Sequence, residues 1–371
     1  MPRVDAVVEC KVHDSFRVQQ VAGMFDVTLA DKLRNSFTVD VPAIEENWQL
    51  GVIVGPSGSG KSTIARTAFG EYLYESGEWS VDKAVIDGFG DSDSGSIRDV
   101  THVLPAVGFS SPPSWVKPYQ VLPNGEKFRC ELARALLSET PVVVFDEFTS
   151  IVDRTVAKIG SAAVSKAIRS GKVARKFVAV TCHYDVVEWL EPDWIVDMAT
   201  QRLDWGRLRR PDITLEIVRC HHSAWSLFAK HHYLNAKNSS AANCYLATWD
   251  GLPVAFCSAL PQLGRKGVWR LSRSVVLPDY QGVGIGSRVS EAVAEIYKSR
   301  GCRVVTTTSN PAMIAHRRKS PLWRVTNVYK AGVPRVMWAR EIGAKPALYR
   351  SSAGRAVVSF EYVRTDVAVT N

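Results

Sequence analysis

The sequence predicts an α/β protein of two domains, and three observations support this fold class. Residues 55–63 read GPSGSGKST, follow an apolar run and precede residues of helical spacing. Residues 269–307 read as a strand, a glycine-rich turn, a helix and a second strand. The charge changes sign along the chain: residues 1–200 hold 20 Lys and Arg against 27 Asp and Glu, and residues 201–371 hold 26 against 10. Alternating strands and helices indicate α/β layers, and the change from −7 to +16 indicates a boundary near residue 205.

The length and composition are those of two soluble globular domains, with 371 residues of which 46% are apolar and 22% charged. We place the domains at residues 1–208 and 209–371. The boundary between them lies within a basic connector that ends at Pro211. The seven cysteines are scattered and never spaced as C-x-x-C, which suits a reducing compartment. No signal pattern or membrane-spanning apolar run is evident. We therefore expect a cytoplasmic protein, in the host cytoplasm if a phage encodes it, with no membrane partner.

Residues 55–63 match the phosphate-loop pattern G-x-x-x-x-G-K-[ST] without a mismatch. The glycines let backbone N–H groups turn toward phosphate oxygens at the start of a helix. In this pattern Lys61 reaches the β- and γ-phosphates, and the Ser62 hydroxyl binds Mg²⁺. A chance match is the alternative, against which the flanking strand and helix argue. The predicted ATP-binding residues of the loop are Gly55, Ser57, Gly58, Gly60, Lys61, Ser62 and Thr63.

A second nucleotide motif is the apolar strand at residues 141–145, which ends in Asp146 and Glu147. Such a strand brings Asp146 to Mg²⁺ beside Ser62, and it brings Glu147 to the attacking water as a catalytic group. Two acids after an apolar strand also occur by chance, but here they follow a phosphate loop. ATP and Mg²⁺ are therefore the predicted ligands of the first half.

In their order, the motifs of the first half resemble those of an ABC-type ATPase. Residues 122–126 stand in the place of that family's L-S-G-G-Q signature, which implies that Asn124 and Gly125 contact the γ-phosphate of an opposite subunit. Residues 149–153 resemble the D-loop, and His183 resembles the switch histidine, which implies a catalytic role. Because such composite sites need two subunits, the resemblance implies a homodimer through the ATPase domain.

The first half also departs from the ABC pattern. Pro123 replaces the signature serine and removes a hydroxyl and an N–H group, which predicts slow hydrolysis at a composite site. Few residues separate positions 108–111 from the signature, so we expect a reduced helical subdomain, and no Q-loop glutamine is evident there. These departures argue against a transporter role. The family's adenine-stacking aromatic is Phe25 or Phe16, unless both are ordinary core residues.

The turn in the second half, Gln281-x-x-Gly284-x-Gly286, resembles the acyl-CoA loop of GNAT-type acetyltransferases, and its N–H groups suit a pyrophosphate. The resemblance implies a mixed-sheet α/β domain that uses acetyl-CoA or another acyl-CoA. It also implies a slot between the strand before the loop, residues 274–276, and the later strand at residues 306–308. The implied cofactor contacts are Val275, Val276, Gln281, Gly282, Val283, Gly284, Gly286 and Asn310. The family's general-acid tyrosine is not evident, and His316 is either its substitute or part of a solvated helix face.

The whole chain resembles phage and prokaryotic ATPase–acyltransferase fusions whose second domain is similar to the Mom DNA-modification proteins, which act on the exocyclic amine of adenine. The residues that carry this resemblance are 231–233, 270–273 and the closing strand 354–362. A base amine needs a proton acceptor and close placement, which a His/Tyr pair beside the thioester supplies. A helix cap or core feature is the alternative for the His-His-Tyr run. The implied catalytic residues are His232, Tyr233, Arg270, Ser272 and Arg273.

The strongly basic second half predicts a polyanionic partner, and nucleic acid, with DNA favoured, fits best. A merely soluble basic surface, or one suited to a CoA phosphate, is the alternative. Three functions remain open. The first is an ATP-dependent or ATP-regulated acyltransferase that modifies a DNA base amine in a flipped or single-stranded base. The second acts on tRNA or RNA bases, and the third is an ATP-switched nucleic-acid-binding protein with a degenerate acyltransferase domain.

Overall fold

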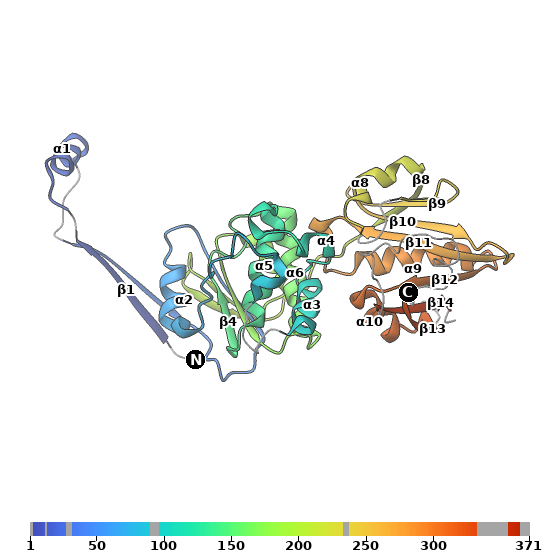
Figure 1. Cartoon of the computed structure of the whole chain (residues 1–371). Helices are drawn as coiled ribbons and strands as arrows, with labels where there is room; N and C mark the ends of the chain where they lie inside the picture. Colours follow the sequence, from blue (N-terminus) through green and yellow to red (C-terminus); the bar gives the residue numbers. More distant parts are fainter. Residues whose placement is uncertain are drawn as a thin grey trace. The chain divides into compact units, whose positions relative to one another are not determined.

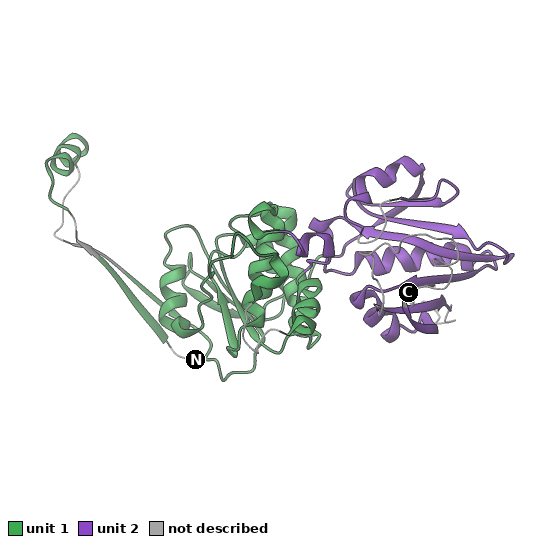
Figure 2. Ribbon diagram, viewed as in Figure 1, with its two compact units in different colours: residues 1–107, 118–211 green, residues 108–117, 212–371 purple. Residues whose placement is uncertain are grey.

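The computed structural model describes residues 3–11, 13–26, 32–89, 96–232, 237–331 and 355–363. The chain forms two compact units, drawn in green and purple in Figure 2. Unit 1 consists of Met1–Val107 and Pro118–Pro211, and unit 2 consists of Gly108–Lys117 and Asp212–Asn371. Both units contain helices packed on sheets (Figure 1), so the predicted fold class of two α/β domains is confirmed. The described residues contain no helix of the length and apolarity needed to cross a bilayer.

The core of unit 1 is a five-stranded sheet in the order β4-β5-β3-β6-β7. Its first four strands pair in parallel, and β7 pairs antiparallel at the edge. Every residue of β3 and β4 is buried, because helices cover both faces of a parallel sheet. The strands are β3 (Leu50–Val54), β4 (Val142–Phe145), β5 (Lys176–Thr181), β6 (Trp194–Asp197) and β7 (Arg202–Trp205).

The helices of unit 1 follow the strands in the alternation that the sequence indicated. The longest, α6, begins at Asp153, whose carboxylate caps it by accepting the N–H groups of Thr155 and Val156. The helices are α2 (Lys61–Phe69), α3 (Ile97–Ala106), α5 (Asn124–Leu137), α6 (Arg154–Arg169) and α7 (Val187–Leu190), with 3₁₀ turns η1 (Gly70–Tyr72), η2 (Val85–Phe89), η3 (Tyr119–Val121) and η4 (Tyr184–Val186).

A separate antiparallel hairpin of β1 (Arg3–Lys11) and β2 (Lys32–Asp40) precedes the sheet of unit 1 (Figure 1). Helix α1 (Phe16–Phe25) lies between the two strands in the sequence. Phe16 and Phe25, the sequence candidates for adenine stacking, lie on this helix and are 75% and 70% exposed. They are therefore not core aromatics.

Unit 2 is built on a seven-stranded mixed sheet in the order β13-β14-β12-β11-β10-β9-β8, in which only β11 and β12 pair in parallel among the described strands. The strands are β8 (Glu216–Cys220), β9 (Asn243–Trp249), β10 (Leu252–Pro261), β11 (Val268–Val276), β12 (Arg303–Thr308), β13 (Trp323–Ala331) and β14 (Arg355–Tyr362). The helices are α4 (Pro112–Trp115), α8 (Trp225–Ala229), α9 (Ile285–Lys298) and α10 (Pro311–Lys319), with 3₁₀ turns η5 (His222–Ala224) and η6 (Pro278–Tyr280).

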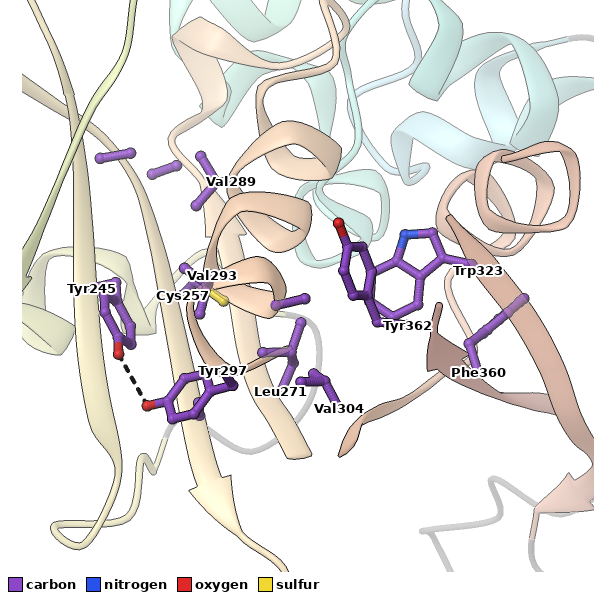
Figure 3. Packing of buried hydrophobic residues seen from close by; sticks show 14 of the residues in the cluster. Tyr245, Cys257, Leu271, Val289, Val293, Tyr297, Val304, Trp323, Phe360 and Tyr362 are labelled. Carbon is purple, nitrogen blue, oxygen red and sulfur yellow. Dashed lines mark hydrogen bonds between the residues drawn. The ribbon is translucent and has the colours of Figure 1, made fainter. Parts of the chain in front are cut away.

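Helix α9 forms the main core of unit 2 with the sheet. Its residues Val289, Val293 and Tyr297 are at most 1% exposed and pack with Leu271 and Val304 of the central strands (Figure 3). The Tyr245 hydroxyl donates to the Tyr297 hydroxyl at 3.0 Å. Anchored along this face, α9 fixes the turn that precedes it against the end of β11.

In unit 1, one buried carboxylate on α5 holds the segment that follows η1. Glu131 is 7% exposed and accepts hydrogen bonds from the Tyr74 hydroxyl at 2.6 Å, the Ser76 hydroxyl at 2.8 Å and the Trp79 indole N–H. The Arg134 guanidinium lies 3.5 Å from the centroid of the Trp79 ring. These contacts tie residues 74–79 to α5.

We expect Glu131→Ala to lower the free energy of unfolding by roughly 2–4 kcal/mol, because it leaves several partly buried donors without an acceptor. Urea denaturation followed by tryptophan fluorescence measures the change. The matched control is Glu139→Ala, which removes an exposed carboxylate close to the end of α5. A loss below about 0.5 kcal/mol, the level of an ordinary surface substitution, contradicts the role given to Glu131.

Candidate functional site

The predicted phosphate loop joins buried strand β3 to helix α2. Gly58 and Gly60 have φ angles of 78° and 87°, a region that glycine adopts without steric cost. The Ser59 hydroxyl oxygen is buried and has no hydrogen-bond partner in the described structure. An unsatisfied polar atom in a loop at a helix N-terminus fits a bound phosphate group. The Lys61 ammonium donates to the carbonyl oxygen of Pro56 at 2.7 Å, so this side chain folds back over the loop.

The structure brings together the two residues predicted to bind Mg²⁺. The Ser62 hydroxyl donates to Oδ1 of Asp146 at 3.1 Å, and the backbone N–H of Glu147 donates to the same oxygen at 2.9 Å. Hydroxyl and carboxylate oxygens are ligands that Mg²⁺ accepts beside nucleotide phosphates. The pair therefore has the chemistry of a magnesium site completed by a nucleotide.

The turn after β4 has an unusual backbone. Glu147 and Thr149 have φ angles of 51° and 68°, which are uncommon for residues other than glycine. Thr149 is fully buried, and its hydroxyl lies 3.2 Å from Nδ1 of His183. Burial, and secondly the charge of Arg154, lowers the pKa of His183. The predicted switch histidine is therefore neutral at neutral pH, and the contact with Thr149 fixes its ring orientation.

Asn124 and Gly125, the residues in the place of the ABC signature, form the first turn of α5. The N-cap residue Pro123 makes no side-chain hydrogen bond. Asn124 is exposed and Gly125 partly exposed. The first N–H groups of a helix have no intrahelical acceptor, so this turn offers donors to an anion. Its contact with a nucleotide stays a prediction.

Sequence reasoning missed Phe37 on β2. A Cβ atom built on Gly60 would lie 2.8 Å from carbons of the Phe37 ring, so this ring packs directly on the phosphate loop. The alternation of residues 36–41 indicated a strand, but the sequence did not show which element its apolar face meets. Position 60 therefore requires glycine for its backbone angle and for the space that the ring occupies.

The central strands of unit 2 separate as the predicted slot requires. β11 and β12 pair from Val268 with Arg303 to Leu271 with Thr306. Beyond these residues β11 and β12 no longer pair with each other, while β11 stays paired with β10 and β12 with β14. In the predicted slot, Thr306 still pairs with Leu271, whereas residues 274–276 and 307–308 no longer pair across it. Such an opening exposes backbone groups that a pantetheine arm can bind.

The predicted acyl-CoA loop lies between the end of β11 and α9. Gly282 and Gly284 have φ angles of 98° and 102°, and Gly284 is the N-cap of α9. A Cβ atom on Gly286 would lie 3.1 Å from Cγ2 of Val276, so glycine allows the helix to approach the strand closely. With Val283 in the same turn, this arrangement presents the N–H groups of the first turn of α9 to a pyrophosphate.

The side chain of Gln281, a predicted cofactor contact, is bound by the protein at both ends. Its Oε1 accepts the backbone N–H of Ser110 at 2.8 Å, and its Nε2 donates to the carbonyl oxygen of Val276 at 2.9 Å. Gln281 is 9% exposed. The side chain thus closes the loop onto its own strand and onto the segment Gly108–Lys117.

A β-bulge at Ser272 determines where Arg273 points. Arg273 pairs with Ser258 and Leu271 with Ala259, so Ser272 is the extra residue of β11. A bulge moves the following side chains to the other face of the sheet. The Arg273 guanidinium donates to the carbonyl oxygens of Lys237, at 2.8 Å through Nη2, and of Ser272, at 3.0 Å through Nη1.

His232 lies just after α8, near Arg273. Its ring makes an edge contact with Trp225, with centroids 5.7 Å apart. Burial, and secondly Arg273, lowers the pKa of His232 to about 4. Of the other predicted catalytic residues, Arg270 is exposed on β11, and Tyr233 lies outside the described residues. The structure thus brings His232, Ser272 and Arg273 into one region, and His232 is neutral there.

Two residues after β12 have partners of their own. Asn310, a predicted cofactor contact, caps α10 by accepting the N–H of Met313 at 3.1 Å. His316 lies 3.1 Å from Oε1 of Glu291 on α9. Burial raises the pKa of Glu291, but His316 and Arg288 outweigh this effect and hold the pKa below its usual range. The sequence offered His316 only as an alternative and gave no sign of its pairing with Glu291.

Comparison with known proteins assigns part of the chain. Residues 208–317 match the model of the Acetyltransferase (GNAT) family, so unit 2 contains a GNAT acetyltransferase domain. No curated protein matches.

Solved structures resemble each half of the chain separately. A dimeric ATP-binding cassette, MJ0796 with ADP and phosphate, is 15% identical over 47% of this chain and 93% of its own, with a TM-score of 0.36. The IAA acetyltransferase of Bacillus cereus ATCC 14579 is 16% identical over 40% of this chain and 99% of its own, with a TM-score of 0.30. The ribosomal-protein-S18-alanine N-acetyltransferase of Escherichia coli is 15% identical over 42% of this chain and 98% of its own, with a TM-score of 0.31.

We expect His232 to make the protein less stable as the pH falls from about 6.5 toward 4. Its folded pKa of about 4 lies below the unfolded value of about 6.5, so the unfolded chain binds more protons in this window. His232→Gln should remove about 1 kcal/mol of the difference in unfolding free energy between pH 7.5 and pH 5.0, a value discounted for the solvated part of the ring. Urea denaturation at both values measures it.

The control for this prediction is His102→Gln, which removes an exposed histidine on α3. It should leave the pH dependence as in the unaltered protein. If His232→Gln keeps the full difference between the two pH values, the histidine is not buried in the neutral form.

Proposed function

We propose that the protein is an ATP-regulated acyl-CoA acyltransferase that modifies a base amine of nucleic acid, with DNA as the favoured substrate. The observation that carries the proposal is the divergence of β11 and β12 beside a glycine-rich turn at the start of α9. The match of residues 208–317 to the GNAT family supports acyl transfer independently of this geometry.

The residues of unit 2 fit the tasks that acyl transfer to an amine requires. The turn at Gly282–Gly284 supplies N–H groups for a pyrophosphate, and the bound thioester supplies the acyl group. Neutral His232 has a basic ring nitrogen, the kind of group that accepts a proton from an attacking amine. Burial, and secondly the charge of Arg273, which disfavours a second cation nearby, lowers the pKa of His232 and keeps it neutral. With its guanidinium held by two carbonyl oxygens, Arg273 is fixed in this position.

The residues of unit 1 fit ATP and Mg²⁺. Ser62 and Asp146 would hold the metal ion, and the phosphate loop with Lys61 would hold the phosphates. Glu147 follows Asp146 on the strained turn and has an exposed carboxylate that can orient a water molecule. The neutral His183 beside Thr149 is available to a γ-phosphate. We infer that nucleotide regulates transfer, and that two copies of unit 1 complete the site as in ABC-type ATPases.

Nucleic acid as the acceptor is supported by exposed basic and aromatic side chains on β12 and β13 of unit 2. Arg303 and Arg324 share the single carboxylate of Glu361, at 2.8 Å and 2.9 Å, so the group keeps a net positive charge. The side chains of Arg303 and Arg324 are 57% and 66% exposed. Tyr329, on the same strand as Arg324, is 45% exposed and offers a face for base stacking.

We expect mass analysis of nucleosides from cells that express the protein to show an acylated base in DNA. His232→Gln should reduce this product by about 100-fold, the usual contribution of a general base. Acetyl-CoA binding by calorimetry should stay within about threefold for this variant. Lys61→Ala should also reduce the product, because it removes the ligand of the nucleotide phosphates.

Glu139→Ala is the control for expression and folding in this experiment, since its side chain is exposed and belongs to none of the motifs. If the acylated base is found only in RNA, the proposed reaction stands and the substrate is RNA instead of DNA. Acetyl-CoA binding without a modified base in DNA or RNA would reject nucleic acid as the acceptor. Failure to bind acetyl-CoA would reject acyl transfer itself.

A further inference from the structure

The segment Gly108–Lys117 comes from the first half of the sequence but belongs to unit 2. It follows α3 almost directly, and it is followed by η3, after which the chain enters the first turn of α5. Both of its ends are therefore covalently joined to elements of unit 1. One of these elements leads straight to Asn124 and Gly125, the residues expected to respond to a nucleotide.

The segment has a defined fold of its own. The Trp115 indole N–H donates to the carbonyl oxygen of Phe109 at 3.0 Å, and the two rings meet edge to face at 6.4 Å. Phe109 and Ser111 are 1% and 2% exposed. A segment closed by a hydrogen bond and a ring contact moves as a unit, so a displacement at one end reaches the other.

This segment holds the acyl-CoA loop through one side chain. The backbone N–H of Ser110 donates to Gln281, and Gln281 in turn donates to Val276, the last residue of β11. Gln281 directly precedes Gly282, so the bridge spans both ends of the turn that would bind the pyrophosphate. Because the side chain is 9% exposed, water replaces these hydrogen bonds poorly when they break.

A second observation relates the same segment to the histidine run. The charge of Lys117, after burial and Lys230, contributes to the lowered pKa of His231. His231 directly precedes His232 in the sequence. The segment thus contacts the cofactor loop through Ser110, and the charge of Lys117 influences the histidine run.

We propose that Gln281 is a positioning residue that couples nucleotide binding in unit 1 to acyl-CoA binding in unit 2 through the segment Gly108–Lys117. This proposal rests on the proposed function, because it assigns the regulation of that site. A nucleotide that rearranges the start of α5 moves η3 and the segment, and the Ser110 N–H then shifts the loop through Gln281. Coupling of this kind is reciprocal, so acyl-CoA changes nucleotide affinity by the same factor.

The test measures acetyl-CoA affinity of the full chain by calorimetry, with and without a non-hydrolysable ATP analogue and Mg²⁺. The unaltered protein should show a ratio of the two dissociation constants of at least threefold. Gln281→Met keeps the side-chain volume but removes both hydrogen bonds, and its ratio should be close to one. Gln281→Glu keeps an acceptor for the Ser110 N–H and should retain part of the ratio, which a purely structural role for the side chain does not predict.

The control variant is Val116→Ala, because Val116 lies in the same segment and is 69% exposed. Its ratio should equal that of the unaltered protein. ATP-analogue affinity should be unchanged in Gln281→Met when acetyl-CoA is absent. A ratio close to one in the unaltered protein, or an unchanged ratio in Gln281→Met, overturns the proposal.

Amide hydrogen exchange of residues 277–288 separates this proposal from the proposed function. The ATP analogue should change exchange in this loop of the unaltered protein at least threefold, but not in Gln281→Met. If the loop responds while acetyl-CoA does not bind, the coupling holds and the acyltransferase function fails. If acetyl-CoA binds and the loop does not respond, the function stands and the coupling fails. Unchanged exchange in the unaltered protein therefore also overturns the inference.

Discussion

The pairing of β11 with β12 determines the shape of the candidate site in unit 2, because it ends partway along both strands. After Leu271 and Thr306 the two strands no longer pair with each other, while β11 stays paired with β10 and β12 stays paired with β14, so the sheet opens between them. The bulge at Ser272 occurs at this point and redirects Arg273. The helix packed below, α9, then brings the glycine turn to the end of β11. The opening of the sheet and the direction of Arg273 thus depend on where this pairing ends.

Unit 1 obeys a different constraint, which is full burial of its parallel strands. β3 and β4 have no exposed residue, so they end where the chain must return to polar surroundings, and each ends in a polar motif. Because parallel strands share an edge, the two motifs meet as the hydrogen bond between Ser62 and Asp146. The strained turn at Glu147 and Thr149 persists because buried neighbours hold it. The nucleotide motifs therefore follow from sheet geometry more than from their own contacts.

Motifs that are local in sequence could be predicted, and contacts set by pairing register could not. The phosphate loop and the turn at Gly284 carry their backbone angles in their own glycines. The bulge at Ser272 depends on the partner strand β10, and the packing of Phe37 on Gly60 depends on which face of β2 meets the loop. The bond from Ser110 to Gln281 joins residues 171 positions apart, across the predicted boundary at residue 208. Hydrophobic periodicity indicates local secondary structure and cannot predict a contact between residues so far apart in the sequence.

Unit 2 is built from two separate stretches of the sequence, so a single boundary does not divide this chain into its two units. A linker that merely joins two domains constrains their distance, whereas Gly108–Lys117 enters unit 2 and returns to unit 1. Besides the main connector at residues 211–212, the chain passes between the units at residues 107–108 and 117–118. The group that binds Gln281 is the main-chain N–H of residue 110, which every amino acid except proline would supply at this position. The link between the halves can therefore persist while the side chains of the segment change, provided that its fold through Trp115 and Phe109 is kept.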